Sequence, residues 1–226
     1  AADAERDYRR AILLKPGYAE AYGWIAQLLA AYGRLPEALE AVDRAQALDP
    51  VSPAMRMAKS GTAWIGDSAE LVVEVARPLR TLRPDMHPAW SQEGMALAVL
   101  GRGRECADWT LAPLTIRAIC LRQSGRIPEA ERLARETESQ LASGVVDVST
   151  AFLPFYIAWS GRLDDAIHAY DRQLNQSPTL FMVSTSHRIL EPVARLGRGR
   201  FFRELIRMRT EAWNRVVAES KHVTLP

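Results

Sequence analysis

Three prolines at a fixed spacing constrain this chain more than any other feature of its sequence. Pro16, Pro50 and Pro84 lie 34 residues apart, and they end the similar tripeptides Leu-Lys-Pro, Leu-Asp-Pro and Leu-Arg-Pro. Proline lacks a backbone N–H and moves the preceding residue out of the helical region, so a helix should end near each of them. A period of this length predicts an array of stacked repeats.

The clearest copy of the repeat covers residues 19–52, where two apolar helical faces are separated by Tyr32, Gly33 and Arg34. The first helix carries large apolar residues at i, i+3 and i+7, and the second carries a stripe of small ones. Gly33 can adopt the positive φ that a tight helix C-terminus requires. One hairpin cannot bury its apolar face alone, so hairpins must stack. The positions are Tyr22, Ile25, Ala26 and Leu29, then Ala38, Val42 and Ala45.

These positions, with Gly33 and Pro50, resemble the signature of the tetratricopeptide repeat family. Residues 1–16 resemble the second half of such a repeat through Ala4, Tyr8 and Ala11. The resemblance covers nearly the whole chain and implies an all-α fold, a right-handed α-solenoid of about six antiparallel helix pairs. It also implies a module that binds or assembles proteins and is not itself an enzyme.

The repeat is strict only up to about Gly101. Residues 53–84 keep the length but replace the turn by Gly66, Asp67 and Ser68, and the glycine after Gly101 follows only 24 residues later, at Gly125. The helix around residues 105–110 is therefore shortened, or the next pair is rearranged, and we expect the stack to bend at residues 109–113. The single expected domain, 1–226, divides into a partial repeat at 1–16, repeats at 19–52, 53–86, 87–112, 113–144 and 147–178, and a degenerate repeat with a capping helix at 183–226.

The composition supports a continuous core and argues against several kinds of chemistry. Hydrophobic residues make up 48% of the chain, and 29 basic against 27 acidic residues give a net charge of +2, so no global field calls for nucleic acid. The sequence contains no zinc-protease, nucleophile-elbow, phosphate-loop or dinucleotide motif. We expect no catalytic residue, cofactor or metal. No apolar run approaches the about 20 residues that span a bilayer, so we expect no membrane insertion.

The two cysteines, Cys106 and Cys120, are predicted to be small core residues. They lie 14 residues apart with no CxxC motif and no nearby histidine. Whether they pair stays open at this point. A cytoplasmic location is the default without a pairing frame, and the alternative is the periplasmic part of a membrane-anchored regulator, which a stable disulfide would favour.

The resemblance predicts a binding groove on the concave side, because the first helices of successive pairs line that wall in this family. Its mostly apolar lining suits an amphipathic helix or an extended apolar segment, including part of the same polypeptide. The alternative is that Trp64 and Phe155 pack between repeats. The expected groove residues are Gln27, Met57, Trp64, Met95, Ile119, Arg122 and Phe155.

A basic patch is predicted near the C-terminus. Arginines on one face of a helix, opposite Phe202, Leu205 and Ile206, could meet phosphate, an acidic peptide or nucleic acid. The alternative is a solvated outer face balanced by Glu204 and Glu211. The patch comprises Arg198, Arg200, Arg203 and Arg207.

The order of strong and degenerate copies and the closing stretch at residues 189–208 resemble the C-terminal repeat regions of bacterial winged-helix transcriptional regulators and class III adenylate cyclases. This resemblance implies a non-catalytic module of a bacterial regulatory or signalling protein that binds a peptide segment or forms a homodimer, without contacting nucleic acid directly. The alternative is the accessory region of a larger enzyme, an adenylate cyclase or a glycosyltransferase, whose catalytic domain lies elsewhere.

Overall fold

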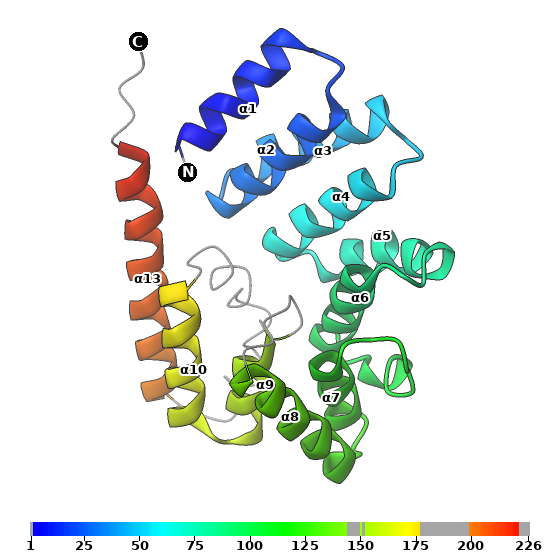
Figure 1. Cartoon of the computed structure of the whole chain (residues 1–226), viewed down its shortest axis with the longest axis vertical. Coiled ribbons are helices and arrows are strands. Elements are labelled where there is room, and N and C mark those ends of the chain that lie inside the picture. The colour runs from blue at the N-terminus through cyan, green and yellow to red at the C-terminus, as the bar shows by residue number, and fades with distance from the viewer. Residues whose placement is uncertain (1, 144–149, 151, 177–198, 222–226) are drawn as a thin grey trace.

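A computed structural model describes residues 2–143, Thr150, residues 152–176 and residues 199–221. All regular structure in these ranges is helical, and most helices follow one another as antiparallel pairs (Figure 1). The pairs are stacked along a strongly curved path, so that the C-terminal helix α13 contacts the N-terminal helix α1. The predicted all-α repeat solenoid is confirmed.

The helices have the following bounds in chain order: α1 (Ala2–Leu14), α2 (Ala19–Ala31), α3 (Leu35–Leu48), α4 (Pro53–Ile65), α5 (Ala69–Leu82), α6 (His87–Val99), the 3₁₀ turn η1 (Gly103–Glu105), α7 (Leu114–Gln123), α8 (Ile127–Ala142), α9 (Leu153–Ser160), α10 (Leu163–Gln176) and α13 (Gly199–Lys221).

The 34-residue period is visible in the helix starts and in the turns. Helices α2, α4 and α6 begin at residues 19, 53 and 87, and the turn residues Gly33, Asp67 and Gly101 have φ angles of 73°, 64° and 75°. After Gly33 the amide of Arg34 donates to the carbonyl of Leu29 at 2.9 Å, the hydrogen bond that closes a helix in the Schellman motif. The same period therefore sets both the helix lengths and the turn geometry.

The second turn keeps the left-handed position of the first turn but has different residues around it. A Cβ at Gly66 would lie 2.5 Å from Cδ1 of Leu35, so a side chain at this position would collide with α3. Gly66 takes the position of Tyr32 in the first turn, and the left-handed conformation falls on Asp67, the equivalent of Gly33; Asp is one of the few residues that tolerate it. The altered Gly66-Asp67-Ser68 turn keeps the hairpin geometry.

The third pair lacks its second helix, as the shortened spacing predicted. Helices α3 and α5 begin at residues 35 and 69, so a third copy would begin near residue 103, where only the 3₁₀ turn η1 is present. Pro113 would fall inside such a helix and remove a hydrogen bond, but α5 accommodates Pro78 at nearly the same repeat position, so the proline alone does not account for the missing helix. Helix α7 starts directly after this proline and packs against α6.

Covalent and polar contacts from α7 hold the truncated pair. The amide of Gly103 donates to Oε1 of Gln123 at 2.5 Å, and Nε2 of Gln123 donates to the carbonyl of Ala98 at 2.7 Å. Cys106 is bonded to Cys120 of α7, and both side chains are fully buried. The prediction of buried cysteines is confirmed, and their pairing, which the spacing left open, is resolved as a disulfide.

A buried carboxylate also anchors this region. Glu93 of α6 has no exposed surface, and it accepts hydrogen bonds from Nε of Arg77 at 2.7 Å and Nε of Arg80 at 2.5 Å. The guanidinium of Arg80 lies 4.7 Å from the ring centroid of Trp90 and 4.4 Å from that of Trp109. Both arginines come from α5, so this cluster joins three successive elements at the point where the repeat is incomplete.

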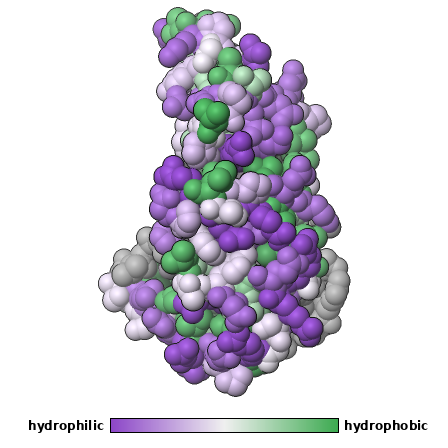
Figure 2. Space-filling view, turned by 90° about the vertical axis from the view of Figure 1, so that its right-hand side faces the viewer, coloured by the Kyte–Doolittle hydropathy of each residue, from purple (hydrophilic) through white to green (hydrophobic). Residues whose placement is uncertain are grey.

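The buried apolar residues form one large cluster that runs from α4 to α13, with two small clusters around α2 and α3. Phe201, Leu205 and Met208 of α13 belong to the large cluster, together with Tyr170 of α10. The outer face on the right-hand side of Figure 1 is mostly hydrophilic, with hydrophobic residues scattered over it (Figure 2). The core therefore follows the curve of the solenoid and includes the C-terminal helix.

Candidate functional site

The residues predicted to line a concave groove do not form an open surface. Trp64, Met95, Ile119 and Phe155 are buried in the large core cluster, so their side chains cannot contact a partner while this fold is closed. Gln27, Met57 and Arg122 are half-buried. The expectation of an exposed groove at the four buried positions is wrong, and the alternative that Trp64 and Phe155 pack within the stack describes them.

The physical reason is the tight curvature of the solenoid. The ring of Trp64 in α4 packs edge-on against Phe152, which precedes α9, with 5.9 Å between ring centroids. The first helices α6, α7 and α9 are buried on nearly all sides, unlike the one-sided helices of an open superhelix. The chain's own later elements therefore cover the concave wall.

Arg122, another predicted groove residue, contacts α9 instead of facing an open groove. Its Nη2 donates to the carbonyl of Trp159 at 3.2 Å, and its guanidinium lies over the rings of Tyr156 and Trp159. These contacts tie α7 to α9 across the inside of the curve. The guanidinium of Arg122 therefore already interacts with residues of the same chain.

The predicted basic patch is only partly present as a free positive surface. Arg200 and Arg203 are exposed on α13, whereas Arg207 is paired with Glu204 at 2.6 Å and Glu211 at 3.2 Å. Arg198 lies outside the described residues. The apolar face of α13 consists of Phe201, Leu205 and Met208, and Ile206, which we expected on that face, is 59% exposed.

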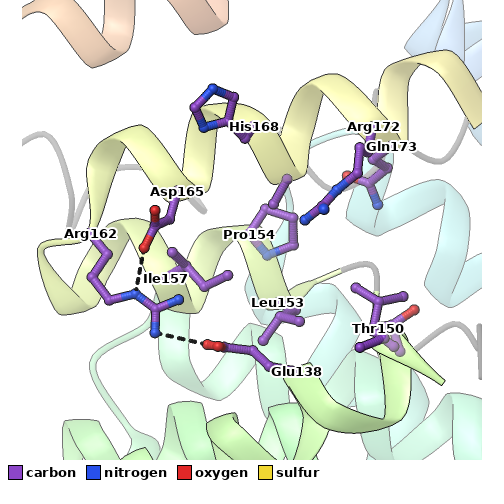
Figure 3. A pocket seen from close by; sticks show the side chains of 13 residues that line it. Glu138, Thr150, Leu153, Pro154, Ile157, Arg162, Asp165, His168, Arg172 and Gln173 are labelled. Atoms are coloured by element: carbon purple, nitrogen blue, oxygen red, sulfur yellow. Dashed lines mark hydrogen bonds and ion pairs between the residues drawn. The ribbon is translucent and has the colours of Figure 1, made fainter.

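An open groove lies instead on the outer side of the stack, between the second helices α8 and α10, with the first helix α9 as its floor (Figure 3). Its volume is about 700 Å³. Leu153, Pro154 and Ile157 form an apolar floor, Leu141 and Ala142 line one wall, and His168, Ala169, Arg172 and Gln173 line the other.

One arginine closes an end of this groove. Nη1 of Arg162 lies 3.0 Å from Glu138 Oε1 on α8, and its Nε donates to Asp165 Oδ2 at 3.0 Å on α10 (Figure 3). The bond to Glu138 is the largest influence that raises the pKa of Arg162 above its ordinary value. Both acidic residues of the lining are therefore engaged by the same cation.

The remaining charge of the groove is positive. Arg172 extends from α10 toward the middle of the groove, and it forms no ion pair or hydrogen bond with the described part of the chain (Figure 3). His168 lies one helical turn before it and is exposed. An apolar floor beside an uncompensated guanidinium favours an acidic, partly apolar ligand.

A sequence motif that we had not singled out marks the closing contact. Arginine follows each of four left-handed glycines and pairs with an acid three residues later: Gly33-Arg34 with Glu37, Gly101-Arg102 with Glu105, Gly125-Arg126 with Glu129, and Gly161-Arg162 with Asp165. The signal is the recurring pattern Gly-Arg-x-x-Glu/Asp. It could have located these arginine contacts without a structure, although a groove accompanies only the contacts of Arg34 and Arg162.

The described residues show neither of two other site types. They contain no group of three histidine, cysteine or acidic side chains placed to hold a metal ion. None of their helices is both long and apolar enough to cross a membrane.

The chain was compared with known proteins. Residues 1–60 match the family model described as tetratricopeptide repeat, which covers α1, α2, α3 and the first part of α4. No curated protein matches the chain. Repeats of this family generally mediate protein–protein interaction and are generally non-catalytic modules.

Proposed function

We propose that this protein is an interaction module that binds a helical segment of a partner protein in the outer groove between α8 and α10. The observation that carries the proposal is the apolar floor of Leu153, Pro154 and Ile157 beside the unpaired Arg172. The partner segment supplies apolar side chains to the floor and a carboxylate to Arg172.

The walls of the groove favour a helix over an extended strand. The wall formed by α10 is a helix whose backbone groups between its first and last turns are hydrogen-bonded within the helix, so this part of the wall offers side chains and no row of free backbone donors or acceptors. An extended segment lying there would bury unpaired N–H and C=O groups, and each would cost about 1–3 kcal/mol. A helix satisfies these groups internally and can lay one apolar face into the groove.

Peptide binding tests the assignment directly. The probe is a fluorescent amphipathic helical peptide of about 15 residues, with leucines on one face and a glutamate beside them. We expect saturable binding by anisotropy, weakened about fivefold or more by Arg172→Glu. Arg132→Glu is the matched control, because Arg132 is exposed on α8 but does not line the groove.

Two results would count against this function. Equal affinity of the wild type, the Arg172→Glu variant and the control variant would remove Arg172 from the site. If Ala142→Trp does not weaken binding, the peptide does not bind in this groove. Ala142 is an exposed lining residue, and tryptophan at its position would occupy the space.

We also propose that the protein works in an oxidising compartment. The cytoplasmic default rested on two cysteines without an evident pairing frame, and the fully buried Cys106–Cys120 disulfide supports the alternative location. Protein isolated from its source cells, denatured and treated with an alkylating reagent should gain no label unless first reduced. Labelling of both cysteines without reduction would contradict the proposal.

The broader setting remains the one that the order of repeats suggested, a bacterial regulatory or signalling protein. The described solenoid supports this proposal only through its interaction surfaces, which suit a module that responds to a partner. Reading the gene on both sides of the coding segment tests it: a winged-helix or other regulatory domain would support it, and a catalytic domain would favour the accessory-region alternative.

A further inference from the structure

A second outer groove lies at the other end of the solenoid. Helices α1 and α3 form its walls and α2 its floor, in a cavity of about 780 Å³. Tyr22, Ile25 and Leu29 line the floor, and Leu13 of α1, which is 80% exposed, lies on the rim. In both grooves the walls are the second helices of two successive helix pairs, and the floor is the first helix of the later pair: α1, α3 and α2 here, and α8, α10 and α9 in the groove of Figure 3.

The two grooves are equivalent residue by residue. The arginines after the turn glycines, Arg34 and Arg162, are 128 positions apart, and eight lining positions coincide after the same shift, among them Leu13 with Leu141 and Tyr22 with Thr150. Ile25 and Leu29 correspond to Leu153 and Ile157 on the floor. On the wall, Glu37, Glu40, Ala41 and Arg44 correspond to Asp165, His168, Ala169 and Arg172.

The closing contact is also repeated. Nη1 of Arg34 donates to Glu5 of α1 at 2.9 Å, and its Nε donates to Glu37 of α3 at 2.7 Å, so one arginine joins the two walls as Arg162 does in the other groove. Arg34 therefore neutralises Glu5 and Glu37 in this groove, as Arg162 neutralises Glu138 and Asp165 in the first one. The charges left for recognition lie further along α3.

Those charges differ between the two grooves at one position. Glu40 takes the place of His168, whereas Arg44 keeps the place of Arg172, and neither Glu40 nor Arg44 has an ion pair or hydrogen bond among the residues that the structure describes. Four residues along a helix correspond to about 6 Å. A ligand helix with a basic and an acidic residue four positions apart matches this pair.

We propose that the groove between α1 and α3 is a second docking site, which takes an amphipathic helix carrying a lysine or arginine opposite Glu40 and an acid opposite Arg44. The inference rests on the proposed function, because it applies the same mode of helix binding to an equivalent groove. It adds a different partner preference at the opposite end of the molecule, so that the module can hold two unlike segments.

The test uses the full chain and a second fluorescent peptide, which has leucines on one face and a lysine and a glutamate four positions apart beside them. We expect saturable binding that Ala47→Trp weakens at least about tenfold, because Ala47 is an exposed lining residue. Glu40→Arg should weaken it about fivefold, and a peptide with glutamate in place of the lysine should restore the affinity.

The controls separate this site from the first one. Glu74→Arg changes the equivalent exposed residue of α5, 34 positions after Glu40, and should leave the affinity unchanged, as should Ala142→Trp in the other groove. Binding that is insensitive to Ala47→Trp, or that responds to Ala142→Trp instead, would overturn the second site. Binding of the first peptide to the wild type and to Arg172→Glu tests the groove between α8 and α10 separately from this second site.

Discussion

Trp64 and Phe152 lie 88 residues apart in the sequence, yet their rings meet edge to face with 5.9 Å between centroids. One belongs to α4 and the other directly precedes α9. Their contact spans the inside of the curve, where an open tetratricopeptide superhelix would leave room for a ligand. At this point the inside of the curve is therefore part of the core, and Trp64 is not accessible to a partner.

The energetic coupling of this pair can be measured. Trp64→Leu and Phe152→Leu should each lower the free energy of unfolding by about 1–3 kcal/mol, because both side chains are almost fully buried. The double variant should lose less than the sum, with a coupling of about 0.5–1.5 kcal/mol. Urea unfolding of the four proteins gives the values. Strict additivity would mean that the curve is open in solution.

The disulfide should stabilise the truncated third pair. Replacing Cys106 and Cys120 together with alanine is expected to lower the free energy of unfolding by about 3 kcal/mol, the loss expected for a loop of this length. Either single variant should lose about as much as the double variant, since each breaks the same bond. Denaturant unfolding with and without a reductant checks this result, and an unchanged midpoint under reduction would contradict it.

The carboxylate of Glu93 should be more important for stability than other acids in the same network. Glu93→Gln leaves Arg77 and Arg80 without their buried counter-ion, and we expect a loss of about 3 kcal/mol. Glu105→Gln is the matched control, because Glu105 also pairs with Arg77 but is exposed, and its loss should stay below about 1 kcal/mol. Thermal unfolding compares them, and equal losses would remove Glu93 from this role.

Close packing of α6 on α7 predicts a cost for a single methyl group. A Cβ at Gly94 would lie 2.3 Å from Cγ2 of Ile116, so Gly94→Ala should destabilise the fold by about 1–3 kcal/mol through overpacking. Gly17→Ala is the control, since nothing lies within 4 Å of a Cβ built there. Chemical denaturation measures both. A neutral Gly94→Ala variant would show that the two helices are further apart than described.

The arginine contacts predict how stability depends on pH. Hydrogen bonds from Arg34 and Arg126 hold the pKa values of Glu37 and Glu129 below the ordinary value of 4.5. A carboxyl group with a lowered pKa in the folded state stabilises the fold fully above its unfolded pKa, and this contribution is lost as the pH falls through the folded pKa. The free energy of unfolding should therefore decrease as the pH falls below about 4.5, the ordinary pKa of a glutamate side chain.

Removing one of these arginines should flatten that acid dependence. Melting temperatures of the wild type and of Arg34→Gln, measured from about pH 6 down to about pH 3, should converge as the pH falls, because Glu37 and Glu5 lose their partner in the variant at every pH. Arg104→Gln, which changes an exposed arginine that does not lower the pKa of Glu5, Glu37 or Glu129, should behave like the wild type. Parallel curves for the wild type and Arg34→Gln would contradict the assignment.

Much of the fold could be predicted from particular residues. Pro16, Pro50 and Pro84 gave the period, Gly33 and Gly101 gave the turns, and Pro113 with the early Gly125 indicated where a helix is lost. These signals are local, because each depends on what one residue does to its own backbone. The helix boundaries up to η1 follow from them.

The site could not be predicted in the same way. An apolar residue on the concave face of a first helix is the same in the sequence whether it meets a ligand or another repeat, so Met95 and Ile119 were assigned to a groove and are buried. The curvature that buries them depends on contacts between distant segments, such as Trp64 with Phe152. The pattern Gly-Arg-x-x-Glu/Asp, by contrast, was readable in the sequence and marks the arginine contacts after the turns, two of which lie at the grooves described above.

Photo-crosslinking tests most directly whether partners bind outside the curve. The acid-bearing peptide, with a photoreactive residue on its apolar face, is irradiated with the intact protein and the adducts are located by mass spectrometry. Adducts on α8 and α10 near Leu141, Ala142 and Arg172 are the result predicted here. Adducts on Gln27 and Met57, the half-buried residues predicted to line a concave groove, would contradict the central claim that partners bind in the outer groove.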